Sequence, residues 1–335
     1  MKNFQNSYKK PSETQTADNT INNFDQVNYL TITPNQDGQR IDNFLLTRLK
    51  GLPKSHLYNM IRRDEIRING KRCKAFNRLN VGDVVRIAPV RLATRDNVMI
   101  SDDFAKSLLS RILYEDDGLI VLNKPYGIAV HGGSGESFGI IEAMRFATGK
   151  KYLELIHRID KETSGLLLIA KKRSTLKELQ ESFRQKTIRK NYLCLVDGHV
   201  QKDRQLIQKP LLKYTLDNGE RRVKVDKNGK DSSTHIQTLA RFYIQNQAVS
   251  LVLASPLTGR THQIRVHMKT IGHALLGDEK YQNNPKAAPV KRLCLHAYEL
   301  FLADCTHPKR PKSFIAQIPD DLAAYINPAW LKQTD

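Results

Sequence analysis

A run of apolar residues from Leu166 to Ala170 constrains the fold of this chain more than any other segment. Every position in the run is apolar, which is typical of a strand that is buried on both faces of a sheet. The polar string from His157 to Gly165 lies between this run and a second strand-like segment, Tyr152 to Ile156. We therefore predict a loop that presents Arg158 and Asp160 at the rim of a well-packed sheet, where reactive groups commonly face a cleft.

The overall charge of the chain indicates its class of partner. Lys and Arg number 54 against 34 Asp and Glu, which gives a formal net charge of +20. Such a field attracts polyanions, and nucleic acid is the commonest of them. A membrane surface is the competing polyanion, but no run approaches the ~18 apolar residues of a spanning helix, and no basic amphipathic tail stands out. The composition therefore predicts binding to nucleic acid and no membrane association.

The cysteines and the first residues indicate the compartment. The four cysteines lie far apart and form no C-x-x-C pair, so we interpret them as small buried apolar groups in a reducing compartment; they are Cys73, Cys194, Cys294 and Cys305. Residues 1–28 are rich in polar side chains and lack the apolar core of a signal peptide. We predict that residues 1–28 are the disordered tail of a cytoplasmic protein.

Residues 29–89 are predicted to form a small basic α/β domain with two short helices and a hairpin. The dipeptide Asn69-Gly70 is a strong hairpin turn signal. Between Arg40 and Val90, twelve basic residues stand against four acidic ones. This arrangement resembles the S4-type RNA-binding domain; a generic solvated basic face is the alternative. The resemblance implies phosphate contacts that position an RNA without reading its bases, and the predicted contacts are Arg40, Lys54, Arg62, Arg63 and Lys71.

The rest of the chain is predicted to be a second, larger domain. Residues 90–110 form a polar segment that we interpret as a linker, and residues 111–330 form the domain itself. Strand-like segments recur along it with few intervening helices. This pattern predicts an α+β domain built on a mixed, mainly antiparallel sheet.

Four motifs occur in order in this second domain: Asn123 to Gly127 with Val130-His131, the string His157 to Gly165, Lys190 to Gly198, and Thr258 to Met268. Their residues and their order resemble those of the RluA family of pseudouridine synthases. Ile159 stands where the family usually has Leu, which is a swap of similar volume. The motifs cover roughly residues 111 to 320, and Gly277-Asp278 follows the last of them.

The resemblance implies a uridine isomerase that acts on 23S ribosomal RNA as a monomer. The same α+β fold is expected, and no cofactor is needed because nothing is oxidised and no group is imported. Two other functions stay open. The first is a non-catalytic RNA-binding or ribosome-assembly factor that keeps the fold, and the second is a pseudouridine synthase that acts on transfer RNA.

The resemblance also assigns three catalytic residues. Asp160 is implied to be the reacting carboxylate, either by attacking carbon or by removing a ribose proton. Arg265 is implied to hold that carboxylate with a bidentate guanidinium; a phosphate contact is the alternative. Tyr192 is implied to stack on the uracil and to assist proton removal at C5. From its strand pattern alone, Tyr192 is a core residue.

The remaining predicted contacts surround this centre. Because a stem hides the target bond, the nucleotide must be flipped out, and Arg158 matches the family residue that holds the RNA open. Lys124 is assigned to the pocket wall, Arg260 to a phosphate, and His262 to the substrate-binding set. Several histidines lie in the motifs, but none has the H-E-x-x-H or Cys–His spacing of a zinc site, so we predict no metal.

Overall fold

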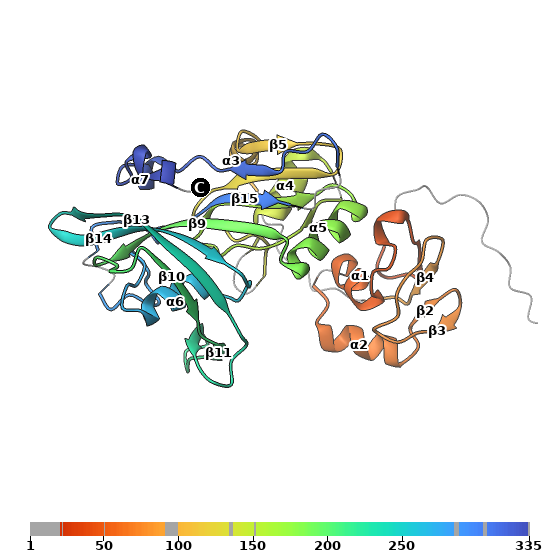
Figure 1. Cartoon of the computed structure of the whole chain (residues 1–335). Coiled ribbons are helices and arrows are strands. Elements are labelled where there is room, and N and C mark those ends of the chain that lie inside the picture. The colour runs from red at the N-terminus through yellow and green to blue at the C-terminus, as the bar shows by residue number, and fades with distance from the viewer. Residues whose placement is uncertain are drawn as a thin grey trace, which may run out of the picture. The chain divides into compact units, whose positions relative to one another are not determined.

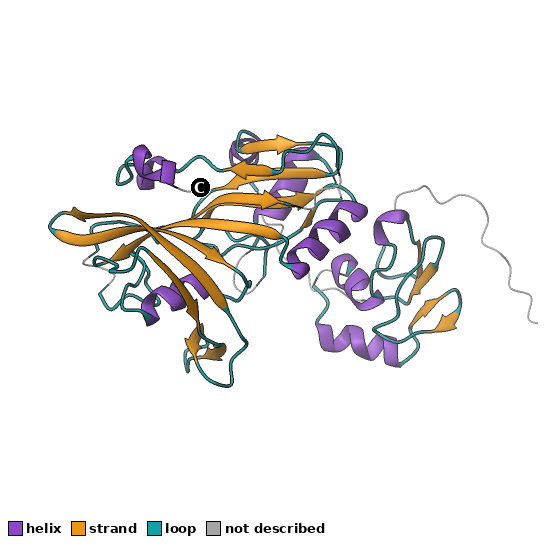
Figure 2. Cartoon of the chain, viewed as in Figure 1, coloured by secondary structure: helices purple, strands orange, loops and turns teal. Residues whose placement is uncertain are grey.

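The computed structural model divides the chain into two compact units, residues 1–97 and 98–335. Figure 1 gives the element labels and Figure 2 shows helices and strands by colour. Most of the predicted tail, together with Lys50 and Cys305, lies outside the residues that the structure describes. The described residues are 21, 23–49, 51–90, 100–133, 137–150, 152–284, 288–303 and 307–333.

The first unit is a four-stranded antiparallel sheet with two helices. The strand order is β1-β4-β2-β3. The strands are β1 (Asn28–Thr31), β2 (Ile66–Ile68), β3 (Lys71–Arg72) and β4 (Val84–Ile87). The helices are the 3-10 turn η1 (Pro34–Gln36), α1 (Ile41–Arg48) and α2 (Lys54–Arg62).

The core of this unit explains its elements. Helix α1 buries Phe44 and helix α2 buries Met60 against the sheet. Asn69 and Gly70 have φ of 51° and 74° at the turn between β2 and β3, which is the conformation that an Asn-Gly hairpin requires. Phe24 packs against the same core, and its carbonyl accepts a hydrogen bond of 2.8 Å from the amide of Val90. The folded unit therefore begins before residue 29.

The second unit is built on a ten-stranded sheet, which Figures 1 and 2 show. The order is β10-β13-β14-β9-β15-β8-β6-β5, with β16 beside β15 and β7 beside β8. Within the described residues only β15 and β8 run parallel, so the predicted mixed, mainly antiparallel sheet is confirmed.

The strands of this sheet extend from residue 112 to residue 315. They are β5 (Ile112–Glu115), β6 (Leu119–Lys124), β7 (Glu154–Leu155), β8 (Ser164–Ala170), β9 (Ile188–Asp197), β10 (Arg204–Gln208), β13 (Ser233–Ile244), β14 (Gln247–Pro256), β15 (Leu295–Leu302) and β16 (Ser313–Ile315). A separate hairpin of β11 (Leu211–Thr215) and β12 (Arg221–Val225) projects from the end of β10 and β13 (Figure 1).

Helices cover parts of this sheet. They are α3 (Asp102–Leu109), α4 (Ile140–Thr148), α5 (Arg173–Gln185), α6 (Gln263–Thr270), α7 (Asp320–Ala323) and the 3-10 helix η3 (Pro328–Gln333). Helix α5 lies against β8, and α3 packs on α4 with the rings of Phe104 and Phe138 5.8 Å apart. Residues predicted as linker therefore include a helix of the second unit. No helix within the described ranges has the length and apolarity to cross a membrane.

Strand β8 is the buried strand that the sequence predicts, since all seven of its residues are buried. Gly165 has a φ of +106°, a left-handed conformation that favours glycine. A side chain there would overlap the backbone of Ala297 on the parallel neighbour β15. The glycine of the motif is therefore needed where these two strands approach each other.

Candidate active site

The loop between β7 and β8 carries Asp160 at the edge of the sheet. Its neighbour Ile159 is buried in the apolar core, whereas the side chain of Asp160 is 25% exposed. The carbonyl of Asp160 accepts a hydrogen bond of 3.1 Å from the amide of Thr163. The carbonyl of Lys161 accepts a second one of 3.0 Å from Gly127. The loop is thus fixed on the C-terminal side of the carboxylate.

Lys124, at the end of β6, is hydrogen-bonded to this loop. The side chain is fully buried, and its ammonium donates hydrogen bonds to the carbonyls of Pro125 (2.7 Å), Ile128 (2.8 Å) and Lys161 (3.1 Å). Burial, with repulsion from Arg292, lowers the pKa of Lys124 to about 7. All three N–H bonds of an ammonium are used. Lys124 therefore supports the wall of the site rather than contacting the substrate directly, because its amine has neither exposure nor a free donor.

Two cavities meet at Asp160. The first has a volume of about 600 Å³ and the second about 930 Å³, and both fall in the range of ligand-binding clefts. Tyr192 and Arg260 line the first cavity, whereas the β11–β12 hairpin lines the second. Asp160, Arg158 and His262 line both. A carboxylate at this junction can meet a nucleotide that enters from either side.

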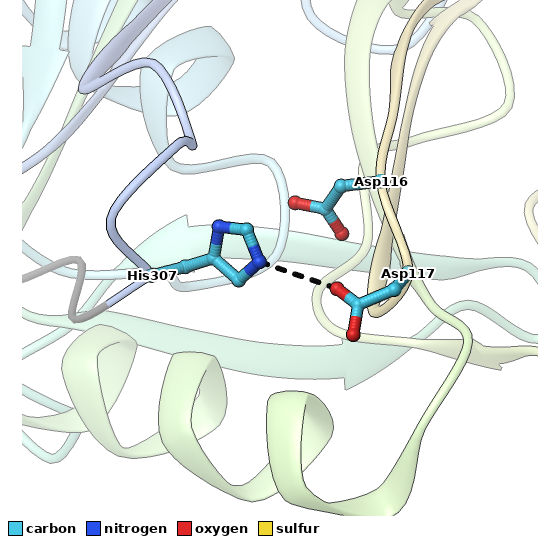
Figure 3. A group of neighbouring side chains, drawn as sticks. All are labelled: Asp116, Asp117 and His307. Carbon is cyan, nitrogen blue, oxygen red and sulfur yellow. Dashed lines mark ion pairs between the residues drawn. The ribbon is translucent and has the colours of Figure 1, made fainter.

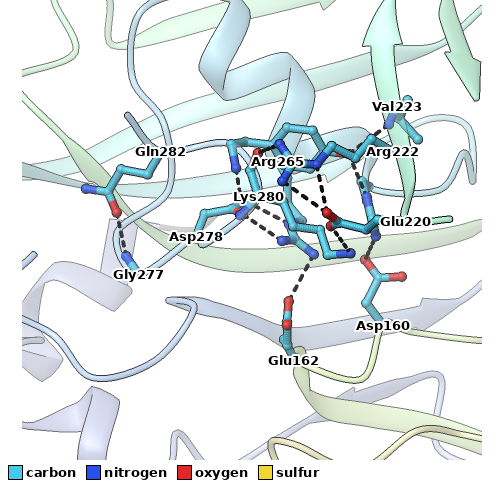
Figure 4. Close-up of polar contacts among 12 residues, drawn as sticks. Asp160, Glu162, Glu220, Arg222, Val223, Arg265, Gly277, Asp278, Lys280 and Gln282 are labelled. Atoms are coloured by element: carbon cyan, nitrogen blue, oxygen red, sulfur yellow. Dashed lines mark hydrogen bonds and ion pairs between the residues drawn. The ribbon is translucent and has the colours of Figure 1, made fainter. Parts of the chain in front are cut away.

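Arg265, on α6, is the buried cation of the site. Its Nε and Nη2 donate to Asp278 at 2.8 and 2.6 Å, and its Nη1 lies 3.2 Å from Oε2 of Glu162 (Figure 4). The bidentate partner is therefore Asp278, and the predicted direct clamp on Asp160 is wrong. Asp278 has no exposed surface, whereas Asp160 is partly solvated. A fully buried carboxylate has the greater need of a paired cation.

The charge of Arg265 nevertheless acts on Asp160 through space. Burial alone would lower the pKa of Arg265, but the hydrogen bonds and charge of Asp278, with the charges of Asp160 and Glu162, raise it above its ordinary value. Arg265 therefore stays cationic. Its positive charge balances a cluster of three carboxylates rather than one.

Tyr192 lies on β9 and lines the 600 Å³ cavity. Burial raises the pKa of Tyr192 well above its usual range, and the negative charge of Asp160 adds to the shift. The phenol is therefore protonated at neutral pH. In that form its hydroxyl can donate a hydrogen bond, and its part in proton removal at C5 stays a prediction. A stacking role for the ring fits this environment, since the ring also packs against the apolar cores.

His262 occupies the N-cap of α6 in a left-handed conformation, with φ of +52°. Its Nδ1 lies 2.7 Å from the hydroxyl of Tyr281, and its Nε2 lies 3.9 Å from Oδ2 of Asp160. Burial lowers the pKa of His262 to about 4, although Asp160 opposes the shift. The imidazole is therefore neutral at physiological pH and faces the carboxylate.

Two exposed arginines complete the lining of the first cavity. Arg158 makes no hydrogen bond or ion pair with any residue that the structure describes, so its guanidinium is available to a ligand. The Nε of Arg260 donates to the carbonyl of Asp231 at 3.1 Å, which leaves part of its guanidinium unused. Both guanidiniums are exposed and can contact a bound RNA.

Of the five RNA contacts predicted in the first unit, one is paired within the described residues and four are not. Arg40 forms a two-point ion pair with Asp42, at 2.6 and 3.1 Å, and Asp42 is nearly fully buried. Arg40 is thus occupied in the fold. The other four side chains are exposed and have no hydrogen bond or ion pair to the described part of the chain; they are Lys54, Arg62, Arg63 and Lys71.

One cluster of possible metal ligands occurs in the described residues, and it is occupied by protein groups. It consists of Asp116, Asp117 and His307 (Figure 3). Asp116 accepts hydrogen bonds from the amides of Gly118 and Leu119, both 2.7 Å, and from Arg310 at 2.8 Å. Asp117 pairs with His307 at 3.2 Å. These contacts connect the β5–β6 turn to a distant loop and explain the cluster without an ion.

Three residues of the site were not predicted from the sequence as functional. Glu162 lies two positions after Asp160 within the motif, and it binds Arg265. Asp278 follows Gly277, whose φ of +70° turns the chain inward, so the Gly-Asp pair was the available signal. Tyr281 gave no signal, because an isolated tyrosine in a loop has no pattern of its own.

Comparisons with known proteins identify the family of this chain. The family model described as RNA pseudouridylate synthase matches residues 118–270. Ribosomal large subunit pseudouridine synthase C of Haemophilus influenzae is 47% identical over 312 residues, which are 90% of this chain and 94% of the relative. The protein of the same name from Escherichia coli K12 is 46% identical over 305 residues, or 88% and 93% of the two chains.

Solved structures give the same result. Human RNA pseudouridylate synthase domain containing 4 is 26% identical with a TM-score of 0.54, and the match covers 66% of this chain and 94% of that one. Human RNA pseudouridylate synthase domain containing 1 is also 26% identical, with a TM-score of 0.52 and coverage of 62% and 82%. The chain therefore belongs to the RNA pseudouridine synthases, which are isomerases, as its motifs predict.

Proposed function

We propose that this chain isomerises uridines to pseudouridine in 23S ribosomal RNA, with Asp160 as the reacting carboxylate. The observation that carries the proposal is the position of Asp160: a partly exposed carboxylate where two cavities meet, between Tyr192 and His262 and near the buried Arg265. The names of the relatives, ribosomal large subunit pseudouridine synthases, support the substrate.

The reaction breaks the N1–C1′ bond and forms a C5–C1′ bond after the base has turned. The hydrogen on C5 leaves as a proton, and N1 gains one, so no atom or electron is imported. Asp160 acts at the sugar, either by attack on C1′ or by removal of the C2′ proton. Because the phenol of Tyr192 is protonated, we assign its ring to stacking on the detached base and its hydroxyl to hydrogen-bond donation.

The target uridine must leave its stack to reach this carboxylate. Arg158 has a free guanidinium beside Asp160 and lines both cavities. We assign Arg158 to the space that the flipped nucleotide vacates, and Arg260 to a neighbouring phosphate. A ribosomal RNA substrate is consistent with the cytoplasmic location and the absence of a cofactor that we predict from the sequence.

A panel of RNAs tests the substrate. Unmodified 23S RNA, 16S RNA and total transfer RNA are each incubated with the protein, and pseudouridine is then mapped chemically. We expect product on 23S RNA alone. Product on transfer RNA alone would favour the transfer RNA modifier. Tight binding to 23S RNA without product would favour the non-catalytic factor.

We further propose that the first unit is an S4-like module that docks RNA by its backbone. The support is the set of four exposed cations described above and the two-helix, basic-hairpin order of the unit. A single chain then carries both functions, because the first unit positions the RNA and the second acts on it. This agrees with the monomeric state that we expect.

Replacing those four cations should weaken RNA binding and its salt dependence. The variant carries Gln at Lys54, Arg62, Arg63 and Lys71. If all four contact phosphates, the slope of log K against log salt becomes shallower by about 3, because each neutralised phosphate releases a counterion. Filter binding at several salt concentrations measures it.

The matched control removes four exposed lysines from the second unit that line neither cavity, namely Lys291, Lys309, Lys312 and Lys332. We expect a much smaller change in its slope. Equal slopes for the two variants would remove the docking role from the first unit.

A further inference from the structure

The geometry points to Tyr281 and His262 as positioning residues that direct one N–H bond at Asp160. This inference rests on the proposed role of Asp160 and adds to it a device that fixes the orientation of the carboxylate. The device is a chain of hydrogen bonds that begins at the backbone of Val223 in β12 and ends at Nε2 of His262.

The direction of this chain follows from its first donor. The backbone amide of Val223 donates to the hydroxyl oxygen of Tyr281 at 3.0 Å, and an amide N–H can only donate. With one acceptor site of its oxygen filled, the hydroxyl has its own hydrogen to direct at its other neighbour. That neighbour is Nδ1 of His262, 2.7 Å away. Nδ1 consequently accepts a hydrogen bond and carries no hydrogen.

The protonation state of His262 then determines whether Nε2, the other ring nitrogen, carries a hydrogen. The ring is neutral near pH 7, because burial lowers its pKa to about 4. The charged groups around it partly cancel, since Asp160 and Asp278 raise the pKa whereas Arg265 and Lys280 lower it. A neutral imidazole has one N–H. With Nδ1 as acceptor, that N–H is on Nε2, the nitrogen that faces Oδ2 of Asp160.

The backbone and packing hold both rings in place. His262 has a positive φ at the start of α6, where the side chain of Gln263 accepts hydrogen bonds from the Arg260 amide (3.0 Å) and the Thr258 hydroxyl (2.6 Å). The ring of Tyr281 lies edge-on to His262, with centroids 5.5 Å apart, and under the guanidinium of Arg265 at 5.2 Å. The two rings therefore pack against each other, and Tyr281 also packs against Arg265.

The distance between the two final groups indicates when the contact acts. Nε2 and Oδ2 are 3.9 Å apart, which is longer than a hydrogen bond. Catalytic contacts are often long without substrate and shorten in the complex. When a flipped nucleotide fills the cavity, we expect the N–H to hold Oδ2 and to leave Oδ1 directed at the sugar.

Two substitutions of His262 separate the roles of its nitrogens. In His262→Gln the amide nitrogen reaches the place of Nε2 and can still donate to Asp160. In His262→Asn the shorter side chain reaches only the place of Nδ1, beside Tyr281. We expect the Gln variant to turn over at least about tenfold faster than the Asn variant, with KM values that differ by less than about twofold, because one charge-assisted hydrogen bond is at stake. Equal kcat values would overturn the inference.

A spectroscopic measurement tests the same point without activity. In protein with ¹⁵N-labelled histidine, the ring shifts of His262 should report hydrogen on Nε2. Tyr281→Phe removes only the hydroxyl and keeps the ring that packs on Arg265, and we expect it to abolish that single tautomer and to lower kcat about tenfold. Hydrogen on Nδ1 in the parent protein would overturn the inference.

These outcomes are separable from failure of the proposed function. If Asp160→Asn retains full turnover, the proposed role of Asp160 fails whatever the tautomer of His262. If Asp160→Asn is inactive while the Gln and Asn variants of His262 have equal rates, only the positioning role fails.

Discussion

Replacing Asp160 by Asn is expected to lower the rate of pseudouridine formation at least about a thousandfold, the scale of losing a principal reacting group. An amide has nearly the same shape as a carboxylate but neither attacks carbon nor takes a proton. The side chain of Asp160 is partly exposed, and Nε2 of the neutral His262 lies 3.9 Å from its Oδ2. The fold should therefore tolerate the change.

The rate is best followed through the hydrogen that the reaction expels. RNA made with tritium at C5 of uridine releases it when the new C5 bond forms, and a single-turnover experiment excludes effects on product release. Thermal unfolding and RNA binding serve as controls, and both should match the parent protein. Tritium release at the parental rate would discard Asp160 as the reacting group.

Replacing Arg265 by Gln is expected to reduce the free energy of unfolding by about 3–5 kcal/mol, which is typical when one partner of a buried ion pair is removed. Arg265 is 1% exposed and Asp278 has no exposed surface, so the aspartate would remain as an uncompensated charge in the interior. Glu162 would lose its cation at the same time. The loss is measured from the urea-induced unfolding transition of the second unit.

Arg260→Gln is the matched control for this experiment. Arg260 lies five positions earlier, is exposed, and donates its Nε to one backbone carbonyl, so we expect a change within about 0.5 kcal/mol. The double variant Arg265→Gln with Asp278→Asn should recover part of the loss, because the buried charge is then removed together with its partner. Equal losses for Arg260→Gln and Arg265→Gln would contradict the buried pair.

The sequence predicted most of the architecture because that information is local. An all-apolar run such as β8 has no stable position except inside a sheet, and Asn69-Gly70 has few conformations other than a hairpin turn. Helix α3 was missed because it is two turns long in a polar segment, and its signal was one capping residue, Ser101, which accepts from the amide of Phe104 at 3.3 Å.

The partners within the site were less predictable, because they depend on which groups the fold buries. Arg265 was predicted to pair with Asp160, but the more deeply buried Asp278 forms the two-point pair. Lys124 has the charge of an RNA contact, but a turn four residues long supplies carbonyls around it. The contact between Tyr281 and His262 joins two loops across nineteen positions, and no sequence pattern indicates it.

Mapping pseudouridine at nucleotide resolution on unmodified 23S RNA tests the central claim most directly. The parent protein and Asp160→Asn are compared at concentrations where both bind the RNA to the same extent. The parent should leave pseudouridine at defined positions, and the Asn variant should leave none in the same time. Identical modification by both proteins would show that the isomerisation does not depend on the carboxylate at the junction of the two cavities.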